Sequence, residues 1–290
     1  MSEFLLTYHH LFNVFLISSG YALSQWIVMR AGVFSVATAG FASLGGYTAA
    51  LLTMKQGVPY GFSLAAGATV GAAAGLLLSW PLARLRGVFQ AIATLAFVQV
   101  VLALALYADN LTGGALGLNA IPNRVGTWQT LLSLLVVLYL MVSMTRTRLG
   151  RAFEAIRQNE AVASSLGVSV RMHQSLAFAL SGGIGGWFGG LEAFQSFTLF
   201  PGTFGFPLVI SVLSYVVLGG RRSVAGPIVG AAILLTLPEF SRPMADYRLA
   251  FYGLVLMLVI AFMPRGIVDT LTLWWRRRQR QQGLAPGESA

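Results

Sequence analysis

Residues 181–190 have the sequence "SGGIGGWFGG" and lie inside an apolar run that extends from about residue 174 to residue 199. A run of this length is sufficient for one membrane-spanning helix, which needs roughly 20 apolar residues. Gly182, Gly186 and Gly190 recur at every fourth position and therefore share one face of such a helix. Because glycine has no side chain, the backbone of a neighbouring helix can come close to this face. The stretch therefore predicts a membrane helix that packs tightly against its neighbours.

The composition extends this interpretation to the whole chain. Of its 290 residues, 56% are hydrophobic and only 10% are charged, whereas a soluble domain usually carries about 25% charged residues. We therefore expect an all-α integral membrane protein, a polytopic helical bundle of about nine spans, within a range of roughly eight to ten. The expected spans occupy the apolar runs at about 11–29, 33–53, 61–80, 88–108, 128–145, 174–199, 207–219, 226–240 and 247–263. The run at 207–219 is too short to cross upright, so it either extends into its flanks or forms a re-entrant segment.

The basic residues predict the orientation of the bundle. With nine spans and the N-terminus outside, fifteen of the 19 basic residues lie in the cytoplasm, where loops rich in arginine normally stay. We therefore expect an N-out, C-in topology. The first residues, "MSEFLLTYHH", lack the basic region and cleavage site of a removable signal peptide, and we expect none. One transmembrane domain is expected over residues 1–270, with a cytoplasmic segment at 146–172 and a basic cytoplasmic tail at 271–290 that is disordered at its end.

Several other classes of protein are disfavoured by the residues present. The sequence has no G-x-S-x-G motif, no H-E-x-x-H motif and no cysteine, so an enzyme is not expected. The three histidines, His9, His10 and His173, fall on opposite sides of the predicted membrane, so we expect no metal site. The net charge of +10 is explained by membrane topology, and no nucleic-acid partner is expected. There is no Walker A motif, so the chain by itself should not bind and hydrolyse ATP in the P-loop manner.

Two polar residues in the 174–199 run are candidates for a translocation path. Glu192 and Gln195 lie in the outer half of the predicted span, where polar side chains are costly and often functional. They could contact a zwitterionic solute or a neighbouring helix. The alternative is that the Glu192 carboxylate reaches water at the membrane interface, and the sequence leaves both interpretations open.

The densest group of charges in the chain is residues 150–168, "GRAFEAIRQNEAVASSLGV". The pattern predicts one helix from Arg151 to about Leu166 that ends at Gly167. Glu154 lies three residues from both Arg151 and Arg157, and local ion pairs are expected. The apolar side of this helix consists of Ala152, Ile156, Ala163 and Leu166. We expect a short amphipathic helix parallel to the membrane that docks into a groove of another protein, the alternatives being a solvated connector or a helix resting on lipid headgroups.

These residues resemble the cytoplasmic coupling segment of permeases of ABC importers. More narrowly, the chain resembles the branched-chain amino acid permease family of the LivM type. The resemblance rests on the coupling segment together with "SVATAGFASLGGYTAALL" (35–52), "LRGVFQAIATLAF" (85–97), "LTGGALGL" (111–118), "VVLGGRRSVAGPIVGAAILLTLPE" (216–239) and "YRLAFYGLVLMLVIAFMPRGI" (247–267). It covers most of the chain, and the combination is specific although no single motif is.

The resemblance implies a permease subunit in the bacterial plasma (inner) membrane that forms a channel with a second, homologous permease subunit. Two cytoplasmic ABC ATPase subunits would bind ATP and Mg²⁺, an extracytoplasmic solute-binding protein would deliver the solute, and this chain would hold no cofactor. It also implies that the ATPase groove receives Gly150, Arg151, Glu154, Ala155, Arg157, Glu160, Ala161 and Gly167.

The solute is less firmly indicated than the class of transporter. Ala39 stands where the family often has histidine, and "GGRRSVAGP" (219–227) departs from the usual pattern. Branched-chain or related amino acids are the expected solutes, with urea, short amides, sugars or nucleosides as alternatives. A stand-alone secondary transporter is the alternative from another class, but it usually needs intramembrane acidic pairs.

Overall fold

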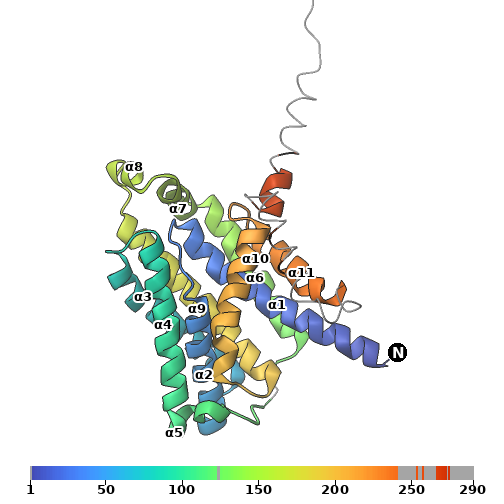
Figure 1. Cartoon of the computed structure of the whole chain (residues 1–290). Helices are drawn as coiled ribbons and strands as arrows, with labels where there is room; N and C mark the ends of the chain where they lie inside the picture. Colours follow the sequence, from blue (N-terminus) through green and yellow to red (C-terminus); the bar gives the residue numbers. More distant parts are fainter. Residues whose placement is uncertain are drawn as a thin grey trace, which may run out of the picture. The chain divides into compact units, whose positions relative to one another are not determined.

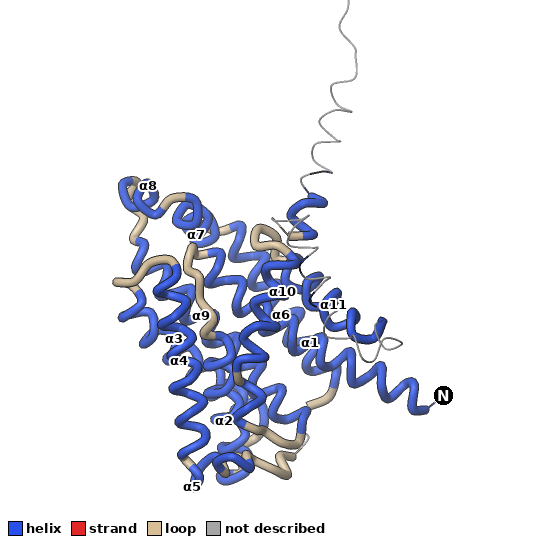
Figure 2. Tube along the Cα trace, in the orientation of Figure 1, coloured by secondary structure: helices blue, strands red, loops and turns tan. Residues whose placement is uncertain are grey.

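The computed structural model describes residues 2–122, 125–240, 253, 257, 266–272 and 274. They are almost entirely helical, and the loops between the helices are short (Figures 1 and 2). The helices are α1 (Ser2–Arg30), α2 (Thr38–Gln56), α3 (Tyr60–Leu82), α4 (Val88–Tyr107), α5 (Asp109–Thr112), α6 (Thr127–Arg146), α7 (Arg148–Gln158), α8 (Glu160–Ser165), α9 (Val170–Ser196), α10 (Phe206–Gly219) and α11 (Ala225–Phe240). Single 3-10 turns at Gly114–Leu116 and Pro201–Phe204 precede α6 and α10.

The chain divides into two compact units, Met1–Leu213 and Ser214–Ala290. The single domain expected over residues 1–270 stays a prediction. The expected span at 247–263 lies outside the described residues, apart from two isolated positions, and so does nearly all of the basic tail from residue 271.

Within the first unit, α2, α3 and α9 pack together most closely, and their glycines allow it. Gly45 of α2, Gly67 of α3 and Gly186 of α9 meet at one level of the bundle. A Cβ on Gly186 would lie 2.4 Å from the carbonyl oxygen of Gly67. One turn towards α8, a Cβ on Gly182 would lie 2.1 Å from the carbonyl oxygen of Gly71. Real Cβ atoms do not come this close to backbone, so these helices touch backbone to backbone.

Five helical segments in the described residues are long and apolar enough to cross a membrane. They are His9–Arg30, Tyr60–Leu82, Val88–Tyr107, Thr127–Arg146 and Pro201–Gly219. The last includes the 3-10 turn before α10, so the short apolar run at 207–219 does extend into its flank. The helices α2 and α9 are not among the five, and both bury many residues against neighbouring helices. A helix that faces protein needs less hydrophobicity than one that faces lipid.

The two ends of the first unit differ in structure (Figure 1). At one end, α7 and α8 link α6 to α9. At the other end lie α5 and the loop that follows it, where the backbones of Leu118 and Leu199 form a β-bridge with N···O distances of 3.0 and 2.8 Å. The bridge ties the loop before α6 to the end of α9.

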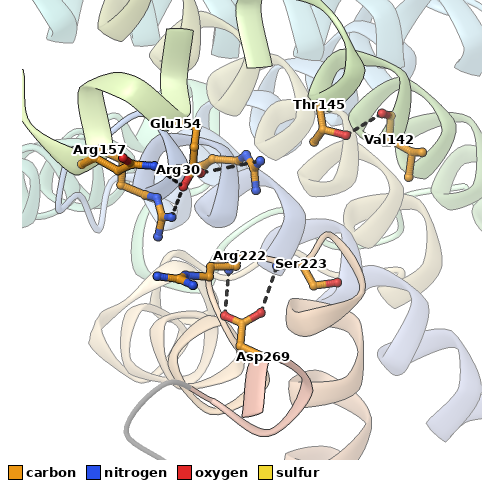
Figure 3. A network of polar contacts seen from close by, with 9 residues as sticks. Arg30, Val142, Thr145, Glu154, Arg157, Arg222, Ser223 and Asp269 are labelled. Atoms are coloured by element: carbon orange, nitrogen blue, oxygen red, sulfur yellow. Dashed lines mark hydrogen bonds and ion pairs between the residues drawn. The ribbon is translucent and has the colours of Figure 1, made fainter. Parts of the chain in front are cut away.

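In the second unit, the end of α10 packs against α11 through small residues. A Cβ on Gly219 would lie 1.8 Å from the carbonyl oxygen of Gly226. The loop between these helices is fixed by Asp269, which is only 4% exposed. Its carboxylate accepts hydrogen bonds from the backbone N–H groups of Arg222, at 2.9 Å, and Ser223, at 3.1 Å (Figure 3). This carboxylate therefore positions the loop that carries two of the chain's arginines.

Candidate functional site

The charged segment at 150–168 forms two helices, which corrects the single helix expected from Arg151 to Leu166. Helix α7 ends at Gln158, and α8 begins at Glu160. Asn159 separates them because its backbone is extended, with φ −160° and ψ 111°. Its side-chain oxygen accepts hydrogen bonds from the backbone N–H groups of Ala161 and Val162, at 3.0 and 3.2 Å. Asn159 is thus the N-cap of α8, a position at which asparagine is strongly favoured.

The break also changes which residues face the bundle. Phe153, Ile156 and Ala163 are almost completely buried, and the Phe153 ring packs edge-on against His173 at the start of α9, with ring centroids 6.1 Å apart. Leu166 was expected on the same apolar side, but it is 76% exposed because α8 starts on a new axis after Asn159. Ala152 is half-buried.

A separate set of small and apolar residues is exposed on α8 and at its end. Val162 is 53% exposed, and Ala161 and Gly167 are exposed as well. We call Ala161, Val162, Leu166 and Gly167 the α8 face. Gly167 has a φ of +81°, in the left-handed region that favours glycine, and it terminates the segment as expected for a residue after a helix end.

Gly150 lies in the first turn of α7, close to the end of α6. A Cβ at this position would lie 2.5 Å from the carbonyl oxygen of Met144 and 2.6 Å from the Cα of Thr145. Both contacts are with backbone and cannot be relieved by a change of rotamer. Gly150 therefore allows α7 to fold back across the end of α6.

Glu154 is the centre of an ion-pair network that joins α7 to α1 (Figure 3). Its carboxylate accepts a hydrogen bond from the Arg157 guanidinium and lies 3.7 Å from that of Arg30, the last residue of α1. Gln158 donates a further hydrogen bond at 3.3 Å. The expected ion pair of Glu154 with Arg157 is present. The second guanidinium near Glu154 is that of Arg30 and not, as expected, that of Arg151, which is exposed. Arg30 is far away in the sequence, so spacing could not reveal it.

The electrostatics of this network favour the ionised carboxylate. Although partial burial disfavours the charged form, the hydrogen bonds from Arg157 and Gln158 and the two guanidinium charges outweigh it and hold the pKa of Glu154 below its usual value of 4.5. The Arg30 side chain is 12% exposed and lies over the Trp26 ring, 5.1 Å from its centroid. This largely covered arginine thus contacts both a carboxylate and an aromatic face.

The remaining residues assigned to the coupling segment are less constrained. The Glu160 carboxylate lies 3.9 Å from the Arg86 guanidinium in an exposed pair, and such pairs contribute little to stability. Ala155 is half-buried on α7.

The two polar residues of the predicted translocation path contact neighbouring helices. The Tyr21 hydroxyl of α1 donates a hydrogen bond to the Glu192 carboxylate. The Gln195 amide donates to the Thr130 hydroxyl of α6 at 2.6 Å. The Glu192 carboxylate thus contacts a neighbouring helix, and its role in a translocation path stays a prediction. On the same helix, a Cβ on Gly190 would lie 2.7 Å from a methyl group of Leu64.

A buried polar network nearer the α7 end was not anticipated from the sequence. The Ser24 hydroxyl of α1 donates to the carbonyl oxygen of Ser181 of α9 at 2.8 Å. The Thr38 hydroxyl of α2 donates to the side-chain oxygen of Gln25 at 2.8 Å. Serine and threonine are common in apolar runs, and only the packing of three helices brings these hydroxyls together. The part of the chain that the structure describes contains no group of three His, Asp or Glu residues placed to hold a metal ion.

Comparison with known proteins agrees with these features. Residues 8–262 match the family model described as branched-chain amino acid transport system / permease component. The high-affinity branched-chain amino acid transport system permease protein LivM of Escherichia coli K12 is 32% identical over 298 aligned positions, which cover 91% of this chain and 69% of that protein. LivM of Salmonella typhimurium has the same identity and coverage.

A more distant relative is the probable branched-chain amino acid transport permease protein LivH of Methanocaldococcus jannaschii, which is 29% identical over 51% of this chain and 47% of that protein. No solved structure matches the chain. The family match extends over most of the residues that form the helices described above, and it includes α7 and α8. The chain therefore belongs to the family of branched-chain amino acid transport permease components.

Proposed function

We propose that this chain is a permease subunit of an ATP-driven importer for branched-chain amino acids in the bacterial plasma membrane. The family match over residues 8–262 and the names of the relatives support the solute class. The observation that carries the coupling role is the α8 face, in which apolar residues are exposed at the same end of the bundle as most arginines of the first unit.

The proposed topology has nine spans with the N-terminus outside and the C-terminus in the cytoplasm. Among the residues that the structure describes, five segments qualify as spans by length and hydropathy. Helices α2 and α9, with 19 and 27 residues, are long enough at about 1.5 Å per residue to cross a core of roughly 30 Å. With α11 and the apolar run at 247–263, the total is nine. The fifteen-to-four distribution of basic residues supports a cytoplasmic position for α7 and α8.

The α8 face is the proposed contact with a cytoplasmic ATPase subunit. On α7, Phe153 and Ile156 are turned towards the bundle, and Glu154 is paired with Arg30 and Arg157. The exposed Val162 and Leu166 are therefore the apolar groups of this segment that remain available to a groove in another protein. Exposed Arg151 lies in the same segment and suits an acidic rim around that groove.

The partners follow from this assignment. A second permease subunit completes the channel, two ATPase subunits hold ATP and Mg²⁺, and a solute-binding protein delivers the amino acid from outside. The chain itself needs no cofactor, because it supplies the path and the partners supply the chemistry.

The test is uptake in cells that lack the gene and are complemented with the complete transporter. We expect uptake of labelled leucine that excess isoleucine or valine suppresses and excess urea or ribose does not. Uptake should stop when the ATPase subunits carry a disabled Walker A lysine. Uptake that persists without ATP hydrolysis and depends on an ion gradient would contradict the proposal, as would uptake of urea in place of leucine.

A further inference from the structure

A groove of about 190 Å³ lies between α2 and α4 and reaches α5. We call it the α2–α4 groove. Its walls include Leu44 and Leu51 of α2 and Val101 and Leu104 of α4. Leu104 is 62% exposed, so the groove opens to the surroundings of the chain along α4. Because a space of about 150 Å³ is enough to bind benzene, the groove has room for a stretch of hydrocarbon chain.

The hydroxyl groups along the groove do not make its surface polar. Tyr47 donates to the carbonyl oxygen of Leu199 at 3.4 Å. Thr48 and Thr112 each donate to a carbonyl oxygen four residues earlier in the chain. The Ser43 oxygen is itself buried and does not open into the groove. The groove therefore presents mainly apolar groups to its occupant.

Helix α4, which forms one wall, faces the hydrocarbon of the membrane. It is the most hydrophobic candidate span in the described part of the chain, with a mean hydropathy of 2.2, and only 28% of it is buried. Val100 and Leu104 are exposed along it, and Tyr107, at its end, is 87% exposed. Tyrosine is enriched where a span meets the membrane surface. The end of the groove next to α5 is therefore level with that surface.

A lysine stands at this end of the groove. Thr48, Leu51 and Lys55 follow one another at intervals of three and four residues and so share one face of α2. Thr48 and Leu51 line the groove, and Lys55 is exposed one turn beyond them. The Lys55 ammonium group donates a hydrogen bond to the carbonyl oxygen of Asn110 in α5 at 3.1 Å. An ammonium group has three N–H donors, so two remain for another acceptor.

The positive charge of Lys55 is not balanced by a carboxylate in the described part of the chain, where none of the three ion pairs includes it. The nearest acidic residue along α5, Asp109, is turned the other way. One of its carboxylate oxygens lies against Gly114, 1.9 Å from where a Cβ on that glycine would be. The groove thus ends at an ammonium group that is available to an anion.

The length of this arrangement matches one leaflet of a bilayer. Leu44 and Lys55 are 11 positions apart, which is about 16 Å along a helix. Half of a hydrocarbon core of roughly 30 Å is about 15 Å. An acyl chain in the groove would therefore begin at the level of Lys55 and end near the middle of the membrane.

We infer that the α2–α4 groove binds an anionic phospholipid. One acyl chain lies against Leu51, Val101 and Leu104, and the phosphate accepts hydrogen bonds from the Lys55 ammonium group. This site concerns the membrane around the permease and does not depend on the solute. In the proposed topology it faces the outer leaflet of the plasma membrane.

The test is photocrosslinking in the complete transporter, reconstituted into vesicles with either of two lipids that carry a diazirine in one acyl chain. One is phosphatidylglycerol, which is anionic, and the other is phosphatidylcholine, which has no net charge. Mass spectrometry of the digested chain locates the crosslinks. We expect phosphatidylglycerol to label residues 44–51 and 101–108, and excess inorganic phosphate to leave this labelling unchanged.

Removing the charge tests the headgroup contact. Lys55→Gln should lower labelling of the groove by phosphatidylglycerol about fivefold, because one lysine near the surface attracts an anionic lipid by roughly that factor. Labelling by phosphatidylcholine should not change. Arg86→Gln is the charge-matched control, since this exposed arginine lies before α4, at the opposite end from α5. It should leave labelling by both lipids as in the parent.

Filling the groove tests the acyl chain contact. Ala108→Phe places a ring at the Lys55 end of the groove and should reduce labelling by both lipids. Ala103→Phe, at another half-buried position of α4 that does not line the groove, is the matched control and should not. If Ala108→Phe does not insert, the surface variant Lys55→Gln still decides the question.

Four results would overturn the inference. They are crosslinks that map outside the two segments, equal labelling by phosphatidylglycerol in Lys55→Gln and the parent, displacement by inorganic phosphate, and labelling that is present in the isolated chain but lost in the complete transporter. The last result would assign the groove to the second permease subunit. None of them bears on leucine uptake, which tests the proposed function separately.

Discussion

The glycine contact between α3 and α9 can be tested by alanine substitutions, because two adjacent glycines of α9 have different surroundings. A Cβ on Gly182 would lie 2.1 Å from the carbonyl oxygen of Gly71, whereas a Cβ on Gly183 would have its nearest neighbours at 3.7 Å. Ordinary van der Waals contact begins at 3.4 Å, so Gly182→Ala requires a separation that is larger by about 1.3 Å. The obstacle is backbone, so the two helices must move apart.

The expected changes in the stability of the folded bundle differ between the two positions. Overpacking of this kind costs about 1–3 kcal/mol, so Gly182→Ala should destabilise the folded bundle by that amount. Gly183→Ala introduces no close contact and should be neutral or stabilising by up to about 1 kcal/mol, because alanine favours the helix more than glycine does.

Reversible unfolding in mixed micelles with increasing mole fraction of SDS measures both variants under the same conditions. The unfolding midpoint of Gly182→Ala should fall, and that of Gly183→Ala should equal or exceed the parent value. Equal midpoints for the two alanine variants would refute the conclusion that α3 and α9 touch backbone to backbone at Gly182.

Three further predictions concern α7, α8 and the loop between α10 and α11. Since the folded-state pKa of Glu154 is lowered from 4.5, its ion pairs stabilise the protein fully above that pH and lose their effect as the pH falls below it. The unfolding midpoint should therefore drop as the pH is lowered from about 4.5, and this drop should be smaller in Glu154→Gln. Val162→Glu should abolish co-purification of the ATPase subunits without changing insertion of the chain into the membrane. Ser164→Glu, on the other flank of α8, is the control and should still co-purify with these subunits. Loss of co-purification in both variants would contradict docking through the α8 face. Asp269→Ala leaves two backbone N–H groups without their acceptor, at a cost of about 1–3 kcal/mol each when buried. Trypsin should therefore cleave after Arg222 faster in this variant than in the parent protein or in Asp269→Asn. An unchanged rate of cleavage would exclude a role of Asp269 in positioning the loop.

The positions of several helices could be predicted from the sequence because a long apolar run is the direct sign of a membrane-spanning helix. The runs at 61–80, 88–108 and 128–145 correspond to α3, α4 and α6 with boundaries that differ by at most two residues. The break at Asn159 was missed, although an asparagine followed by glutamate is a recognisable helix start. A prediction from helical periodicity assumes that the helix continues through Asn159. It therefore put Leu166 on the apolar side, whereas Leu166 is exposed.

The contacts between distant segments could not be predicted in the same way. The pairing of Arg30 with Glu154 and of Tyr21 with Glu192 depends on how α1 lies against α7 and α9. The space lined by Leu51 of α2 and Val101 of α4 likewise depends on how these two helices pack. These features arise from the packing of helices, and no spacing within one helix encodes them.

Two of the ionic and polar contacts of helix α1 lie at separate levels, and this has a mechanical consequence. Arg30 contacts the segment proposed to receive the ATPase, and Tyr21, nine residues earlier, contacts the Glu192 carboxylate within the bundle. At about 1.5 Å per residue these contacts are roughly 14 Å apart along a continuous helix. A hydrogen-bonded helix without proline behaves as a stiff rod over this distance. A displacement of α7 that moves Arg30 would therefore be transmitted along α1 to Glu192, so this first helix forms a stiff connection between α7 and the interior of the bundle.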